Sequence, residues 1–103
     1  MGRFEKLKEL MKENPTDNFL RHALALEYIK AGDDEKAKNI FEEILNESPD
    51  YTGSYYHLAK LLERMDETDL AVQWYKKGLE ATRLAGDTHA FSELKAAYED
   101  LVF

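Results

Sequence analysis

The chain has 103 residues, 44% hydrophobic and 34% charged, a composition that suits one folded domain and argues against disorder. Its 21 acidic residues outnumber its 14 basic ones and give a net charge of −7, which argues against nucleic-acid binding because that binding depends on neutralised phosphates. The absence of cysteine excludes disulfides and cysteine-based zinc sites, and no apolar run approaches the roughly 18 residues of a membrane span, so we expect a cytoplasmic protein without membrane contact.

Apolar residues recur at helical spacing from the start of the chain. The spacing predicts a first helix over 3–13 that must end before Pro15, because the residue preceding a proline is pushed out of the helical region. A second helix can be capped by Thr16 or Asp17, whose side chains can accept a hydrogen bond from its first turn. It should stop at Gly32, since glycine readily takes the left-handed conformation that ends helices.

The next three predicted helices are delimited by the same kinds of residue. Asp33 or Asp34 can cap the third helix, which should end before Pro49. Asp50 is placed to cap the fourth helix, and Thr68 opens the fifth. All three segments carry apolar residues three and four positions apart, as expected for helices with one buried face.

The sixth predicted helix is preceded by a stop and a cap, Gly86 and Asp87. Its apolar face consists of Phe91, Leu94 and Tyr98. The connections between helices are only a few residues long, which is typical of antiparallel helix hairpins packed in one domain. The sequence therefore predicts an all-α fold of about six antiparallel helices.

The only two prolines of the chain lie 34 residues apart, and other residues repeat at the same spacing. The repeated residues sit where the two helices of a hairpin would touch, and they include small residues that allow close approach of the backbones. The matched pairs are Leu24 and Leu58, Ala25 and Ala59, Ala37 and Ala71, Phe41 and Tyr75, and Leu45 and Leu79. Self-similarity at such a period indicates a stack of helical repeats.

These spacings resemble the tetratricopeptide repeat (TPR), a 34-residue helix–turn–helix with the signature W-x2-L-G-x2-Y followed by Ala, an aromatic residue and Pro. The first repeat matches with Leu24, Ala25, Tyr28, Ala37, Phe41 and Pro49, and the second with Tyr55, Leu58, Ala59, Leu62, Ala71, Tyr75 and Gly78. Three residues depart from the pattern: Arg21 at the tryptophan position, Ile44 at a small position and Arg83 at the proline position.

The resemblance covers nearly the whole chain and implies a right-handed α-solenoid. It divides the single domain, 1–103, into an N-terminal half-repeat helix (3–13), a first repeat (18–49), a second repeat (52–85) and a C-terminal capping helix (88–102). Because Arg83 replaces the proline, we expect the fifth helix to continue beyond it. The chain looks most like the small stand-alone TPR proteins of bacteria, for which the resemblance implies an adaptor or scaffold role.

No arrangement of residues in the sequence indicates catalysis. The carboxylates fall mostly on polar helix faces, and there is no glycine-rich phosphate loop. His22, His57 and His89 belong to different predicted helices, and none has a second histidine or a cysteine one turn away. We therefore predict that the protein is not an enzyme and has no catalytic residue, metal site or cofactor.

In TPR proteins the first helices of the repeats line a concave groove that binds a protein or peptide partner. The resemblance implies that this groove is lined by Phe19, His22, Leu26, Ile29 and Lys30 from the first repeat and Gly53, Tyr56, Lys60, Glu63 and Arg64 from the second. Such a groove could hold an extended or helical peptide with an acidic group. The carboxylate clamp of chaperone-binding TPR domains is absent, since its positions hold His22, Leu26 and His57.

Two alternatives stay open. The apolar groove residues could be covered by a terminal helix or by another subunit rather than by a peptide. The protein could also be a structural or oligomeric subunit that associates through the ends of the stack, because Trp74 and the apolar segment 101–103 offer more hydrophobic surface than so short a stack should bury. We therefore expect a monomer or a weak homo-oligomer.

Overall fold

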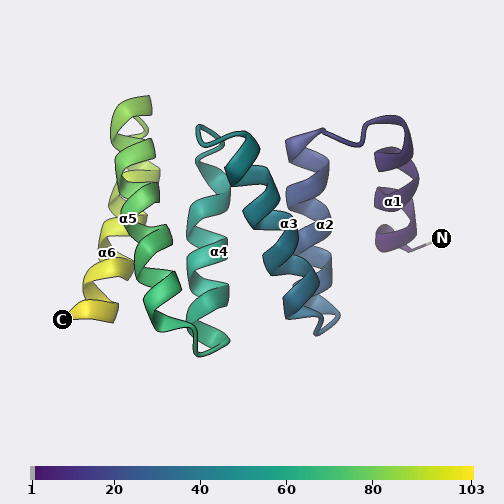
Figure 1. Cartoon of the computed structure of the whole chain (residues 1–103). Helices are drawn as coiled ribbons and strands as arrows, with labels where there is room; N and C mark the ends of the chain where they lie inside the picture. Colours follow the sequence, from purple (N-terminus) through teal and green to yellow (C-terminus); the bar gives the residue numbers. More distant parts are fainter. Residues whose placement is uncertain (1) are drawn as a thin grey trace.

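A computed structural model describes residues 2–103, and this part of the chain consists of six helices without a strand (Figure 1). The helices are α1 (Arg3–Glu13), α2 (Asn18–Lys30), α3 (Asp34–Glu47), α4 (Gly53–Arg64), α5 (Thr68–Ala85) and α6 (Thr88–Val102). The predicted all-α fold is confirmed.

The six helices form a stack that follows their order in the chain. Each helix contacts the next one, and α4 also contacts α6. The molecule measures 44 × 29 × 20 Å, and its elongated shape is visible in the row of helices (Figure 1). A stack in which elements contact mainly their neighbours is the arrangement of helical solenoids, which confirms the predicted TPR-like α-solenoid.

Aspartates cap three of the helices by accepting a backbone hydrogen bond from the first turn. The donors are the amides of Leu20 for Asp17, Lys36 for Asp33 and Ala90 for Asp87, at 3.0, 3.3 and 3.1 Å. Of the two candidate caps for each of the second and third helices, the structure thus uses Asp17 and Asp33. The φ angles of Gly32 and Gly86 are +82° and +69°, so both glycines end their helices in the left-handed region, as predicted.

The predicted cap at Asp50 is wrong. The chain forms a turn after Pro49, in which the amide of Tyr51 donates to the carbonyl of Ser48 at 2.9 Å. Helix α4 therefore begins only at Gly53, and the Thr52 side chain before it makes no capping hydrogen bond. At the end of the second repeat, α5 continues past the missing proline to Ala85, as predicted.

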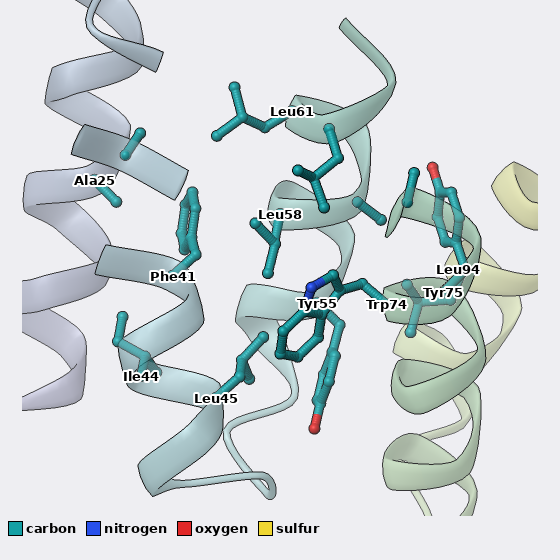
Figure 2. Close-up of a cluster of buried hydrophobic side chains, with 14 residues drawn as sticks. Ala25, Phe41, Ile44, Leu45, Tyr55, Leu58, Leu61, Trp74, Tyr75 and Leu94 are labelled. Atoms are coloured by element: carbon teal, nitrogen blue, oxygen red, sulfur yellow. The ribbon is translucent and has the colours of Figure 1, made fainter. Parts of the chain in front are cut away.

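Most of the repeat-matched residues belong to the main core (Figure 2), whereas Leu24 belongs to a second cluster and Leu79 is only partly buried. Ala25, Ala37, Phe41, Leu58 and Tyr75 are completely buried between α2, α3, α4 and α5. Figure 2 shows Phe41, Leu58 and Tyr75 on successive helices, together with Leu94 of α6. Because each apolar face is covered by the next helix, the repeat pattern of the sequence is also the packing pattern of the core.

A second, smaller cluster holds α1 against the stack. Leu7 is buried against Ala23 and Leu24 of α2, and the ring of Phe4 meets that of Tyr28 edge-on with centroids 4.9 Å apart. The Arg3 guanidinium and the Glu27 carboxylate form an ion pair at 2.8 Å beside them. Helix α1 thus covers the apolar face of α2 that α3 leaves open.

The prediction that Trp74 contributes surplus hydrophobic surface is wrong, whereas the end of α6 remains exposed. Trp74 is only 6% exposed, because it packs against Tyr55 with ring centroids 6.1 Å apart. In contrast, Val102 and Phe103 are 39% and 96% exposed.

Candidate interaction face

The residues predicted to line a groove form one stripe on α2 and one on α4, because they recur three and four positions apart. We call these two stripes together the α2–α4 face; its members are Phe19, His22, Leu26, Ile29, Lys30, Tyr56, Lys60, Glu63 and Arg64. Gly53, also predicted for the groove, is the exposed first residue of α4. Helices α2 and α4 approach each other at His22, whose Nδ1 lies 2.8 Å from the hydroxyl oxygen of Ser54 at the start of α4.

A pair of histidines lies at the junction of the two stripes. The His22 ring meets the His57 ring edge-on at 5.1 Å between centroids, and it also packs against Phe41 at 5.3 Å. Sequence reasoning missed this pair because the two histidines belong to different helices. The signal that could have revealed it is the repeat itself, since His57 lies one position after the residue that matches His22.

Burial favours the neutral form of both histidines. Burial, with a smaller contribution from His57, lowers the pKa of His22 to about 4. Burial also lowers the pKa of His57, although the Glu93 carboxylate opposes this shift. Among residues 2–103 no group of three histidine, cysteine or acidic side chains is arranged to hold a metal ion. The pair is therefore an aromatic, hydrogen-bonded part of the surface.

The apolar side chains of the α2–α4 face differ in their exposure to solvent. Leu26, Ile29 and Tyr56 are half-buried and pack against the main core. Phe19 is 72% exposed, which is unusual for a phenylalanine and leaves most of its ring free. A substitution at Phe19 can therefore probe binding without disturbing the core.

The basic members of the face are paired with acidic groups of the same chain. Lys30 lies 3.6 Å from Glu27, and Lys60 lies 3.6 Å from Glu63. Arg64 forms a closer pair with Asp34, at 2.7 Å. All three basic side chains are about half exposed or more, and ion pairs of this kind contribute little stability.

The larger hollows of the surface lie elsewhere. A cavity of about 430 Å³ opens between α3 and α5 and is floored by Leu45, Tyr55 and Trp74. It contains none of the residues predicted for the groove. Sequence reasoning missed this cavity because three helices contribute to it, and its aromatic residues read as ordinary core residues of the repeat.

Comparison with known proteins identifies the repeat. The family model for the tetratricopeptide repeat matches residues 28–98. The chain belongs to the tetratricopeptide repeat family. The crystal structure of a TPR domain protein from Salinibacter ruber is 44% identical, covers 82% of this chain and 94% of its own, and superposes with a TM-score of 0.78. A solution structure from Bordetella parapertussis, 23% identical, covers 98% of this chain and 88% of its own with a TM-score of 0.83, so the two proteins share this fold.

Two curated relatives match this chain over a small part of much longer chains. Mouse aspartyl/asparaginyl beta-hydroxylase is 28% identical over 80 residues, which is 78% of this chain and 11% of that protein. Human interferon-induced protein with tetratricopeptide repeats 2 is 28% identical over 103 residues, 96% of this chain and 21% of that protein. TPR domains generally mediate protein–protein interaction and are non-catalytic, and a match to one ninth of a hydroxylase does not establish an enzymatic role.

Proposed function

We propose that this TPR domain is a non-catalytic adaptor that binds a peptide or protein partner on the α2–α4 face. The observation that carries this proposal is Phe19, an exposed aromatic side chain at a partner-facing position of the family. Beside it, Leu26, Ile29 and Tyr56 offer half-buried apolar surface. Large aromatic side chains of this kind are frequent anchors of protein interfaces.

The chemistry of the face favours a partner with both apolar and acidic groups. An apolar side chain would cover Phe19 and the half-buried residues near it, whereas a carboxylate would replace an internal partner of Lys30, Lys60 or Arg64. We place this interaction in the cytoplasm, in line with the acidic, cysteine-free composition. No helix within residues 2–103 is long and apolar enough to cross a membrane.

The experiment that tests the proposal selects peptides from a phage library of short random sequences on the immobilised protein and measures their affinity by fluorescence anisotropy. We expect the selected peptides to be rich in apolar and acidic residues. Phe19→Ser should weaken their binding about tenfold or more, because it removes the exposed anchor. The matched control is Leu10→Ser, which removes another exposed apolar side chain, on α1, and should leave the affinity unchanged.

Two results would contradict the proposal. One is equal affinity of the wild-type protein and the Phe19→Ser variant for every selected peptide. The other is loss of binding in Leu10→Ser and Phe19→Ser alike, which would indicate a non-specific apolar interaction. Circular dichroism of each variant separates loss of binding from loss of fold.

A second candidate function is self-association as a structural or oligomeric subunit. Val102 and Phe103 favour it, because they leave an apolar end of α6 exposed. The stack would then act as a building block, and its concentration would determine how much of it is assembled.

A further inference from the structure

The exposed side of α5 carries one narrow stripe of residues. Gln73, Lys77, Glu80 and Leu84 are spaced four, three and four positions apart, so they lie on one face of the helix. We call these four residues the α5 stripe. All of them are exposed, and Leu84 is 72% exposed. The stripe therefore leaves most of one apolar side chain uncovered at its end.

The cavity of about 430 Å³ between α3 and α5 runs beside this stripe. Figure 2 shows Leu45 of α3, Tyr55 of α4 and Trp74 of α5 grouped at its floor. The hydroxyl of Tyr55 already donates to a backbone carbonyl of the turn before α4, at 2.6 Å. The cavity therefore offers an apolar side chain a floor whose tyrosine needs no further hydrogen-bond partner.

Charges of both signs lie at the edge of this cavity. The Lys77 ammonium lies 4.5 Å from the centre of the Trp74 ring and forms no ion pair within residues 2–103. Glu80 accepts two hydrogen bonds from Arg83, at 2.7 and 3.1 Å, and a carboxylate has lone pairs for further donors. Asp50 lines an adjoining hollow of about 290 Å³. An occupant of the cavity should therefore carry an apolar group and charges of both signs.

An antiparallel copy of α5 has these groups at matching distances. The α5 stripe is symmetric about its midpoint, since Lys77 and Glu80 are equally far from it, as are Gln73 and Leu84. When two copies of the helix run antiparallel about this midpoint, Lys77 of each lies opposite Glu80 of the other. The same register sets Leu84 of one copy beside Trp74 of the other, which lines the cavity. One arrangement thus pairs the charges twice and covers the exposed leucine twice.

We propose that α5 is the contact surface of a two-fold symmetric dimer of this chain. Leu84 of each copy enters the cavity of the other beside Trp74, and Lys77 of each copy pairs with Glu80 of the other. Contacts in which the same surface serves both copies form the commonest class of soluble homo-oligomers. The inference rests on the self-association candidate, but it uses neither the α2–α4 face nor the end of α6.

A charge-swap experiment tests this contact. Sedimentation velocity of the wild-type protein from about 10 µM to about 1 mM should show a dimer whose fraction rises with concentration. Lys77→Glu and Glu80→Lys should each weaken the dimer at least about tenfold, because like charges then face each other twice. An equimolar mixture of the two variants should form a heterodimer, since each acidic position of one copy then faces a basic position of the other. The double variant should dimerise like the wild type for the same reason.

The control variant is Lys12→Glu, which makes the same change of net charge on an exposed lysine of α1 and should leave the dimer unchanged. An equal loss in Lys12→Glu would indicate an effect of net charge and overturn the α5 contact. A wild-type protein that stays monomeric throughout the range also overturns it, and so does a mixture of the two α5 variants that stays monomeric.

The same measurements separate this contact from the other proposals. If Lys77→Glu and Glu80→Lys associate as strongly as the wild type, the self-association candidate stands and the α5 contact is overturned. Peptide binding by Lys77→Glu should match that of the wild type, because Lys77 lies outside the α2–α4 face. Circular dichroism of each variant separates loss of association from loss of fold.

Discussion

Gly78 allows α5 to lie close against its neighbours. A Cβ atom at this position would lie 2.8 Å from the Cβ of Tyr55 and 3.0 Å from Leu94 Cδ1. We predict that Gly78→Ala lowers the free energy of unfolding by about 1–3 kcal/mol, because overpacking outweighs the up to about 1 kcal/mol that alanine gains over glycine in a helix. The control is Gly53→Ala, whose added Cβ meets nothing within 4 Å. Urea denaturation should show a loss only for Gly78→Ala; equal stability of the two variants would contradict the close approach.

Arg21 shows how this chain tolerates a departure from the repeat pattern. It stands at the tryptophan position, and yet it is only 5% exposed. Its guanidinium donates hydrogen bonds to Glu43 and Glu47 of α3, both at 3.3 Å, and to Asn18 of α2 at 2.5 Å. Arg21 therefore connects α2 to α3 through its charged end, while its hydrocarbon stem is buried as an apolar side chain would be.

The pair of His22 and His57 makes stability depend on pH. The pKa of His22 falls from 6.5 to about 4 on folding, so the unfolded chain binds a proton more readily than the folded one. This contribution to stability is fully present above pH 6.5 and is lost as the pH falls toward 4. Because His22 is partly solvated, we expect a loss of about 1–2 kcal/mol from this group rather than the full value of the shift.

The corresponding experiment compares wild type with His22→Gln by urea denaturation between about pH 7 and about pH 4, a range that spans the pKa of His22 in the unfolded chain, 6.5, and in the folded chain, about 4. Glutamine does not titrate, so the variant should lose less stability over this range than wild type. Parallel pH dependences of the two proteins would mean that other groups, such as carboxylates, cause the acid sensitivity.

Helix α6 begins at a capping aspartate that also contacts the turn before α4. The Asp87 carboxylate accepts hydrogen bonds from the Ala90 amide and from the Thr52 hydroxyl, both at 3.1 Å, and so connects α6 to the turn before α4. We predict that Asp87→Ala lowers the free energy of unfolding by about 1–2 kcal/mol. Asp50→Ala is the control, since Asp50 caps no helix. Thermal unfolding checks both variants; an equal loss at Asp50 would contradict this assignment of the caps.

The positions of the helices could be predicted from the sequence because prolines, glycines and caps act locally. Much of the core could be predicted as well, since most of the apolar residues that match at 34-residue spacing are buried between neighbouring helices. The prediction that Asp50 caps α4 is wrong, because a turn after Pro49 delays the start of this helix to Gly53. An aspartate is common both in turns and at helix caps, so its residue type alone does not distinguish the two. Local signals therefore sufficed for the elements but not for every boundary.

The surface was less predictable, because it depends on how helices from different repeats meet. The contact between His22 and His57 arises only where α2 and α4 approach each other, and the cavity between α3 and α5 forms only where three helices meet. The prediction that Trp74 leaves surplus apolar surface exposed is wrong for the same reason, since Tyr55 of the neighbouring helix packs against its ring. The role of the α2–α4 face stays a prediction, because the contacts within one chain do not reveal a partner.

At the scale of the whole molecule, the stack separates two surfaces. The α2–α4 face has an exposed phenylalanine and basic residues that form ion pairs with acidic groups of the same chain, and His22 of this face contacts His57. The cavity between α3 and α5 is lined by apolar residues and by Lys77 and Glu80, and the Lys77 ammonium lies 4.5 Å from the centre of the Trp74 ring. The two surfaces share no residue, so a substitution in one leaves the side chains of the other unchanged.

Nuclear magnetic resonance mapping of a selected peptide on the ¹⁵N-labelled protein tests whether the α2–α4 face is the partner-binding surface. We predict that the amide shifts that change on titration cluster on α2 and α4, around Phe19, His22, Tyr56 and Lys60. The shifts of Trp74 and Leu84 should stay in place at protein concentrations below the onset of self-association. Shift changes that are confined to the cavity between α3 and α5, or that are spread evenly over the six helices, would show that the partner binds elsewhere.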